Sequence, residues 1–89
     1  METMTKEQVK ERVVRGYAKR GWEKEMEREL VDTPSYCEYG GVGAVLLAVR
    51  GTPPRGYALY IPRYRRLVYY DSSGRGTGSQ DNIILEGYE

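Results

Sequence analysis

The sequence predicts a single α+β domain in which an N-terminal amphipathic helix packs against an antiparallel sheet of three to five strands, connected as a meander. Three observations support this fold class. Apolar residues recur at the helical period over the first third of the chain, short Tyr-rich and β-branched runs follow, and Gly or Pro separates those runs. A chain of 89 residues has room for one hydrophobic core, so residues 1–89 are expected to form one domain.

The predicted helix begins at Thr5, which forms a capping-box pattern with Gln8 three residues later. Apolar residues then recur at four-residue steps in two series that merge into one stripe: Val9, Val13 and Tyr17, and Val14, Ala18, Trp22, Met26 and Leu30. Lys, Arg and Glu occupy the remaining positions, which is typical of an amphipathic helix.

Two arrangements fit this stripe. Either one helix tolerates Gly16 and Gly21, or two helices meet near Gly21, where Lys and Arg precede the glycine as they do at helix ends. We favour one helix over residues 5–31, which the Asp-Thr-Pro sequence at 32–34 would end.

The pattern changes to strands after Pro34. We expect a short strand at residues 35–39, a turn at 40–41 and a strand at 42–50 that is buried in the sheet because it is almost entirely apolar. Two consecutive prolines make residues 51–54 a loop. Gly and Ser dominate residues 72–81, which are expected to form a flexible loop, and residues 82–86 form a last short strand.

A β-hairpin is predicted for residues 56–62 and 65–71, joined around Arg63 and Tyr64. This register gives one face that suits a core, made of Tyr57, Leu59, Ile61, Val68 and Tyr70. The opposite face is more apolar than a solvent face should be and consists of Ala58, Tyr60, Arg65, Leu67 and Tyr69. Either the helix covers one face and a partner the other, or the sheet rolls around the helix.

The chain offers little reactive chemistry. It has one cysteine and no histidine, which excludes an intramolecular disulfide, makes a structural zinc site untenable and removes the usual general base. Cys37 has Glu38 beside it and no feature that would lower its pKa. We therefore expect no catalytic residue, no metal and no cofactor.

One stretch of the hairpin resembles a known enzyme family. The sequence Gly56-Tyr57-Ala58-Leu59-Tyr60-Ile61, a turn, and Leu67-Val68-Tyr69-Tyr70-Asp71-Ser72 resembles the hairpin of papain-like and Ulp-like cysteine peptidases. The resemblance puts Asp71 at the position of the acid, whereas the histidine position falls near Gly56 or Tyr57. It therefore implies a catalytically inactive remnant.

Composition also indicates habitat. The lone cysteine, the absence of a signal-like stretch and the short longest apolar run predict a cytoplasmic protein without a membrane span. Asn, Gln and Cys are scarce while 30% of residues are charged, which is typical of proteins from thermophiles or their viruses.

A basic centre lies inside a chain of net charge +1, because residues 50–75 hold six arginines and a single acid, Asp71. Tyrosine alternates with arginine there, a pattern found at protein interfaces and on surfaces that stack nucleobases. The predicted binding residues are Tyr60, Arg63, Tyr64, Arg65, Arg66, Leu67, Tyr69 and Arg75. We expect a non-enzymatic module that binds a protein partner or itself as a homodimer, and the alternative is a nucleic-acid-binding protein.

Overall fold

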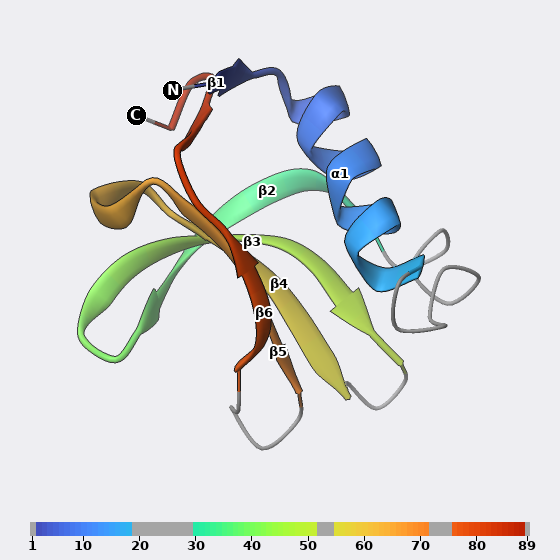
Figure 1. Ribbon diagram of the computed structural model, residues 1–89. Coiled ribbons are helices and arrows are strands. Elements are labelled where there is room, and N and C mark those ends of the chain that lie inside the picture. The colour runs from blue at the N-terminus through green and yellow to red at the C-terminus, as the bar shows by residue number, and fades with distance from the viewer. Residues whose placement is uncertain (1, 19–29, 52–54, 72–75, 89) are drawn as a thin grey trace.

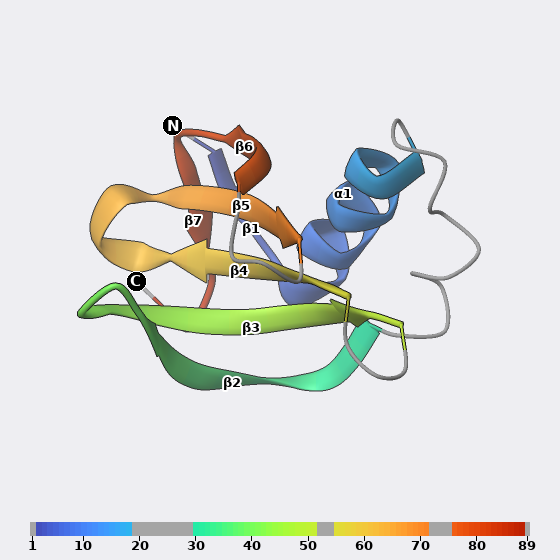
Figure 2. The same cartoon turned by 90° about the horizontal axis from the view of Figure 1, so that it is seen from below.

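The computed structural model describes residues 2–18, 30–51, 55–71 and 76–88. The elements follow one another as β1 (Glu2–Met4), α1 (Lys6–Ala18), β2 (Leu30–Tyr39), β3 (Val42–Arg50), β4 (Gly56–Ile61), the 3-10 turn η1 (Pro62–Tyr64), β5 (Arg66–Asp71), β6 (Gly76–Gln80) and β7 (Ile83–Leu85). Strands β2 to β6 lie side by side in chain order as an antiparallel meander (Figures 1 and 2). The predicted fold class, an N-terminal helix on an antiparallel sheet, is confirmed.

The start of α1 is held by a capping box. The Thr5 backbone N–H donates to Oε1 of Gln8 over 2.9 Å, and the Gln8 N–H donates to Oγ1 of Thr5 over 3.3 Å. Val9 and Val13, one turn apart, are completely buried against the sheet. The predicted start and apolar face of the helix are therefore confirmed.

The predicted end of the helix is wrong. Residues 30 and 31 belong to β2, and Leu30 is the register partner of Ala48 in β3. Backbone pairing with β3 outweighs the helical spacing that extended the apolar stripe to Leu30. Residues 19–29, including Gly21, lie outside the described part of the chain, so the choice between one helix and two concerns residues not described.

Pro34 lies inside β2, where the sequence predicted a boundary. The strand tolerates this proline because β2 is at the edge of the sheet and its register shifts between Leu30 and Ser35. The turn at Gly40 and Gly41 forms as predicted, with both residues at positive φ.

The expectation of a loop over residues 72–81 is wrong for residues 76–80. These residues form β6, which pairs with β5 at the other edge of the sheet. A strand neighbour satisfies their backbone groups, and this outweighs the turn-like composition. Strand β7 forms at residues 83–85 as predicted, but it pairs in parallel with β1 and not with the main sheet, which brings the two ends of the chain together (Figure 1).

Both faces of the hairpin β4–β5 carry apolar clusters, and its predicted register is confirmed, with Leu59 opposite Val68 and Ile61 opposite Arg66. The main core lies between the sheet and α1 and includes the face formed by Ala58, Tyr60, Leu67 and Tyr69. A second cluster on the other face is formed by Ala44, Leu59, Ile61 and Val68.

The sheet curls over this second cluster. Tyr39 on β2 and Tyr70 on β5 have ring centroids 4.3 Å apart, although β3 and β4 lie between their strands. Strands of a flat sheet are spaced about 4.8 Å apart, so three such intervals would separate β2 from β5 by about 14 Å. Curling of the sheet together with the length of the two side chains closes that distance.

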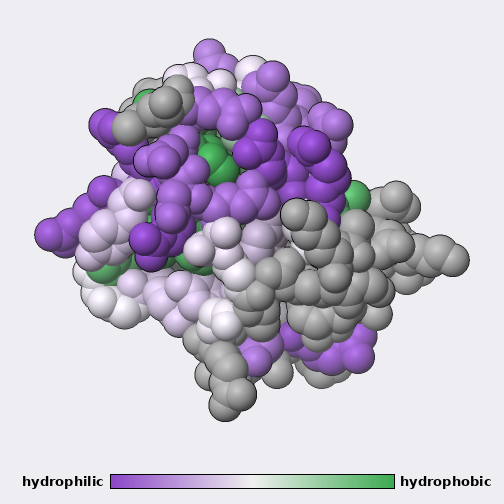
Figure 3. Space-filling view, in the orientation of Figure 1, coloured by the Kyte–Doolittle hydropathy of each residue, from purple (hydrophilic) through white to green (hydrophobic). Residues whose placement is uncertain are grey.

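The surface seen in the direction of Figure 1 is mostly hydrophilic, with small apolar patches (Figure 3). Within the described part of the chain, no helix has the length and apolar content needed to cross a membrane.

Candidate binding surface at the hairpin tip

Three of the predicted binding residues are core residues. Tyr60, Leu67 and Tyr69 are at most 1% exposed because their face of the hairpin packs under α1. The Tyr60 hydroxyl donates to the backbone carbonyl of Ile83 over 2.8 Å, and the Tyr69 hydroxyl accepts from Nε2 of Gln80 over 3.1 Å. The assignment of these three side chains to a binding surface is corrected: they hold the helix and the C-terminal segment against the sheet.

The other predicted residues gather at the end of the hairpin. We call η1 together with Arg65 and Arg66 the hairpin tip. Arg63, Tyr64, Arg65 and Arg66 are all exposed there, and the Tyr64 side chain is 53% exposed. The Arg63 guanidinium carbon lies 5.8 Å from the centroid of the Tyr64 ring. Arg75 lies outside the described residues.

The backbone of the hairpin tip is fixed at both ends. Pro62 opens the turn, and Arg65 closes it in the left-handed conformation at φ 51° and ψ 44°, with its N–H donating to the Pro62 carbonyl over 3.1 Å. The Arg65 carbonyl in turn accepts from the Ile83 N–H over 2.9 Å. These bonds hold the exposed side chains on a defined turn attached to the C-terminal segment.

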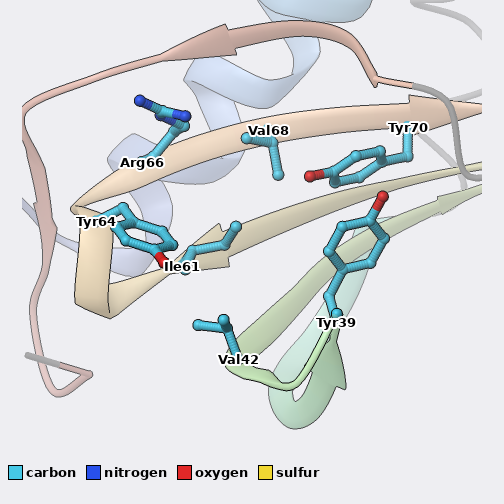
Figure 4. Close-up of a pocket in the computed structure, with 8 residues that line it drawn as sticks. Tyr39, Val42, Ile61, Tyr64, Arg66, Val68 and Tyr70 are labelled. Atoms are coloured by element: carbon cyan, nitrogen blue, oxygen red, sulfur yellow. The ribbon is translucent and has the colours of Figure 1, made fainter.

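A hollow of about 260 Å³ opens beside the hairpin tip, on the face that carries the second cluster. Val42, Ile61 and Val68 supply its aliphatic lining, and Tyr39, Tyr64, Tyr70 and Arg66 surround them (Figure 4). We call it the apolar hollow. It combines an apolar interior with a few polar groups at its rim, which is the usual composition of a binding pocket.

Two polar side chains at the rim of the apolar hollow, Tyr70 and Arg66, determine its charge. Burial raises the pKa of Tyr70, and the hydrogen bond and proximity of Tyr39 raise it further, while nearby Arg66 acts in the opposite direction. Nε of Arg66 lies 2.7 Å from Oδ1 of Asp81, which orients the guanidinium. The Tyr70 phenol is therefore neutral at physiological pH, and the permanent positive charge at the rim comes from Arg66.

A second hollow of about 200 Å³ lies on the opposite face of the hairpin tip. Its described lining is formed by Tyr60, Pro62, Arg63, Arg65 and Ile84, which include two arginines and no acid. We call it the basic hollow.

The sequence did not single out Tyr39, Val42, Ile61, Val68 and Tyr70 as surface residues. For three of them the sequence did contain a signal: the predicted hairpin register placed Ile61, Val68 and Tyr70 on one face of the hairpin. The contribution of Tyr39 and Val42 could not be foreseen, because it depends on how the β2–β3 turn curls over that face.

Cys37 and Asp71 lie far apart in the sheet. Cys37 is opposite Ala44, whereas Asp71 is opposite Gly56, whose other neighbour is Arg50. Six residues along β3 separate these positions by about 20 Å at 3.3 Å per residue. Desolvation also raises the pKa of the Cys37 thiol. Among the described residues, no group of three or more His, Cys, Asp or Glu is arranged to hold a metal.

Compared with known protein families, curated proteins and solved structures, the chain gives no significant match. A functional assignment therefore depends on the geometry of its own surface.

Proposed function

We propose that this domain is a non-enzymatic protein-binding module that contacts its partner through the hairpin tip and the apolar hollow. The observation that carries this proposal is the hollow of about 260 Å³ that Val42, Ile61 and Val68 line, between tyrosines and Arg66 beside a hydrogen-bonded turn. Tyrosine and arginine are enriched at the energetic centres of protein interfaces.

The size of the apolar hollow supports a protein ligand. Pockets for drug-sized ligands measure about 300–1,000 Å³, whereas a cavity of about 150 Å³ holds benzene. A volume of about 260 Å³ thus suits one large side chain of a partner.

Charge favours a different protein over a second copy of this chain. A two-fold contact places the same patch on both subunits. Such a contact through the hairpin tip would bring exposed Arg63 close to its own copy, and like charges oppose association.

The proposal is tested by selecting peptides from a random display library on the immobilised domain, with Val42→Asp as the disrupted variant. Val42 is half-buried at the hollow, so the added carboxylate would make its interior polar. Thr3→Asp, on exposed β1, is the matched control. We expect peptides that bind the native domain and the control but not Val42→Asp, with circular dichroism confirming that both variants fold.

The absence of enriched peptides, or enrichment that Val42→Asp leaves unchanged, would contradict the proposal. Sedimentation velocity over a range of concentrations identifies self-association in the same variants. We expect a monomer, and a dimer abolished by Val42→Asp would make the second copy the partner.

Nucleic-acid binding is the second candidate, favoured by the Arg63–Tyr64 contact beside Arg65 and Arg66. Exposed aromatic rings stack bases, and guanidinium groups bind phosphate. Fluorescence anisotropy with labelled single- and double-stranded oligonucleotides tests it at low and near-physiological salt. Tight, salt-sensitive binding that the triple Arg63, Arg65 and Arg66 alanine variant loses would support it, and no binding at low salt would exclude it.

We also propose a cytoplasmic protein from a heat-adapted source, on the basis of its single cysteine and its few Asn and Gln residues. Mesophilic domains unfold at about 45–65 °C. A thermal midpoint clearly above that range would support the heat-adapted source, and one within it would count against it.

A further inference from the structure

Two tyrosines from strands that are not neighbours in the sheet meet at the rim of the apolar hollow. Tyr39 is the last residue of β2 and Tyr70 lies near the end of β5, and their side chains face one another (Figure 4). We propose that this pair is a site of oxidative cross-linking, at which a one-electron oxidant joins the two rings as dityrosine. The link would fasten β2 to β5 across β3 and β4 and fix that wall of the apolar hollow.

The contact between the two rings is close enough for direct coupling. Their centroids are 4.3 Å apart and their planes differ by 31°. Centroids of paired aromatic side chains usually lie about 4.5–7 Å apart, so the rings of Tyr39 and Tyr70 are closer than is usual. A hydrogen bond also joins the two side chains, so their hydroxyl ends lie together. The Cε atoms beside each hydroxyl are the ring carbons at which tyrosyl radicals couple.

The reaction balances with an oxidant that takes up two electrons in single steps, such as persulfate. Each phenol first loses one electron and its hydroxyl proton. The two radicals form a bond between one Cε atom of each ring, and the hydrogen on each of these carbons then moves to the oxygen of its own ring, which restores both phenols. Persulfate takes up the two electrons and becomes two sulfate ions, and two protons are released into water.

The surroundings of the pair favour a link within one chain. Tyr39 and Tyr70 are half-buried and line the apolar hollow, so a small oxidant can reach them more easily than a tyrosine of a second molecule can. Groups held in contact react as if at very high local concentration, with effective molarities of up to about 10⁵–10⁸ M. Coupling within the pair should therefore be faster than coupling between chains in dilute solution.

A second tyrosine pair offers a comparison within the same molecule. The ring centroids of Tyr36 and Tyr88 are 5.2 Å apart with 51° between the planes, and the Tyr88 hydroxyl donates to the Pro34 carbonyl over 3.1 Å. Tyr36 is 69% exposed, so it can meet tyrosines of other molecules. This wider and more exposed pair should contribute to links between chains and not to the link within one chain.

The proposal is tested on the dilute full chain with photo-activated tris(bipyridyl)ruthenium(II) and persulfate. Free tyrosine is oxidised in parallel to show that the oxidant is active, and Cys37 is first blocked with iodoacetamide because an exposed thiol is oxidised as well. We expect a monomeric product that has lost two hydrogen atoms, shows dityrosine fluorescence and forms in a yield independent of protein concentration. Tandem mass spectrometry of its tryptic peptides should place the link between Tyr39 and Tyr70.

Conservative variants assign the link to this pair. Tyr39→Phe and Tyr70→Phe keep the rings but lack a phenol, so each should abolish the monomeric product, with circular dichroism showing that the fold is kept. Tyr57→Phe is the matched control, because Tyr57 is half-buried on the same face of the hairpin and is the register partner of Tyr70. It should leave the yield unchanged.

The stability of the product tests whether the fold arranges the two rings in advance. A link that closes a loop restricts the unfolded chain, so the cross-linked monomer should unfold about 10 °C or more above the Tyr39→Phe chain after the same oxidation. That variant experiences the same side reactions but cannot form the link. A link between Tyr39 and Tyr70 that lowers the thermal midpoint would show that the rings must be forced together, and would overturn the proposal.

Three further results would overturn it. They are a product that Tyr39→Phe leaves unchanged, covalent dimers alone, and no product at all while free tyrosine reacts. A link mapped to Tyr36 and Tyr88 within one chain, in place of Tyr39 and Tyr70, would do the same. None of these results affects the protein-binding function, because the display selection that tests it involves no oxidation.

Discussion

Replacement of Gly16 by alanine tests whether Tyr69 fixes α1 on the sheet. Gly16 is a buried residue of the helix, and a Cβ added there would lie 2.6 Å from Cζ and 3.2 Å from Cε1 of Tyr69, with the hydroxyl also in conflict. Carbon atoms in good contact are about 3.5–4.0 Å apart, so the ring or the helix must move by about 1 Å. Tyr69 is 1% exposed, which leaves it little space to do so.

The expected magnitude follows from three contributions. Alanine in a helix interior is favoured over glycine by about 1 kcal/mol. Overpacking a core costs about 1–3 kcal/mol, and loss of the hydrogen bond that Gln80 donates to the displaced Tyr69 hydroxyl costs about 1 kcal/mol more. Gly16→Ala should therefore lower the free energy of unfolding by about 1–3 kcal/mol, or about 4–8 °C in Tm for each kcal/mol.

Urea and thermal unfolding followed by circular dichroism measure this change. Gly43→Ala is the matched control, because Gly43 is exposed in β3 with no atom within 4 Å of the added Cβ, and it should be neutral or slightly stabilising. In a Tyr69→Leu background, which removes the conflicting ring atoms, Gly16→Ala should become stabilising. A higher Tm for Gly16→Ala alone would refute the close approach of Tyr69 to the helix.

Other predictions concern the hairpin and the cysteine. Arg65→Gly should raise the free energy of unfolding by about 1 kcal/mol in urea titrations, because glycine adopts positive φ without strain; an unchanged or lower value would contradict this. Tyr60→Phe should lower it by about 1–2 kcal/mol, because the buried carbonyl of Ile83 loses its donor; an unaltered urea midpoint would show that this bond contributes nothing. Since the fold raises the pKa of Tyr70 above the unfolded value of 10.0, its contribution is complete below that pH and is lost as pH rises through the folded pKa. Stability should therefore fall at strongly alkaline pH, and less so for Tyr70→Phe, which is checked by urea titrations at neutral and alkaline pH. Alkylation of Cys37 by iodoacetamide should accelerate only at a pH above that of an unperturbed thiol, because desolvation raises its pKa.

The helix shows where local information was sufficient. The capping box of Thr5 and Gln8 and the buried spacing of Val9 and Val13 involve residues within one or two turns of each other, so the sequence predicted the helix start and its apolar face. The sequence wrongly carried the helix to residue 31, because the apolar spacing continued to Leu30, whose partner is Ala48 on another strand.

The two faces of the hairpin also show that the sequence does not predict contacts between distant elements. The alternation of side chains along a strand correctly placed Tyr60 and Ile61 on opposite faces of the hairpin. The sequence also indicated that both faces were too apolar to be exposed to solvent. It assigned the partner-facing role to the side of Tyr60, Leu67 and Tyr69, which α1 covers. Alternation separates the two faces of a strand but does not state which of them a distant helix will cover.

The sequence by itself determined the elements whose causes are local: the helix start, the register of the β4–β5 hairpin, the glycine turn before β3 and the concentration of arginine around residue 64. Only the tertiary structure decided that β6 joins the sheet, that the ends of the chain pair as β1 and β7, and that Tyr39 meets Tyr70 beside an apolar hollow. These features arise from contacts between residues far apart in the chain. Their free energy depends on sheet curvature and helix placement, which no short stretch of sequence specifies.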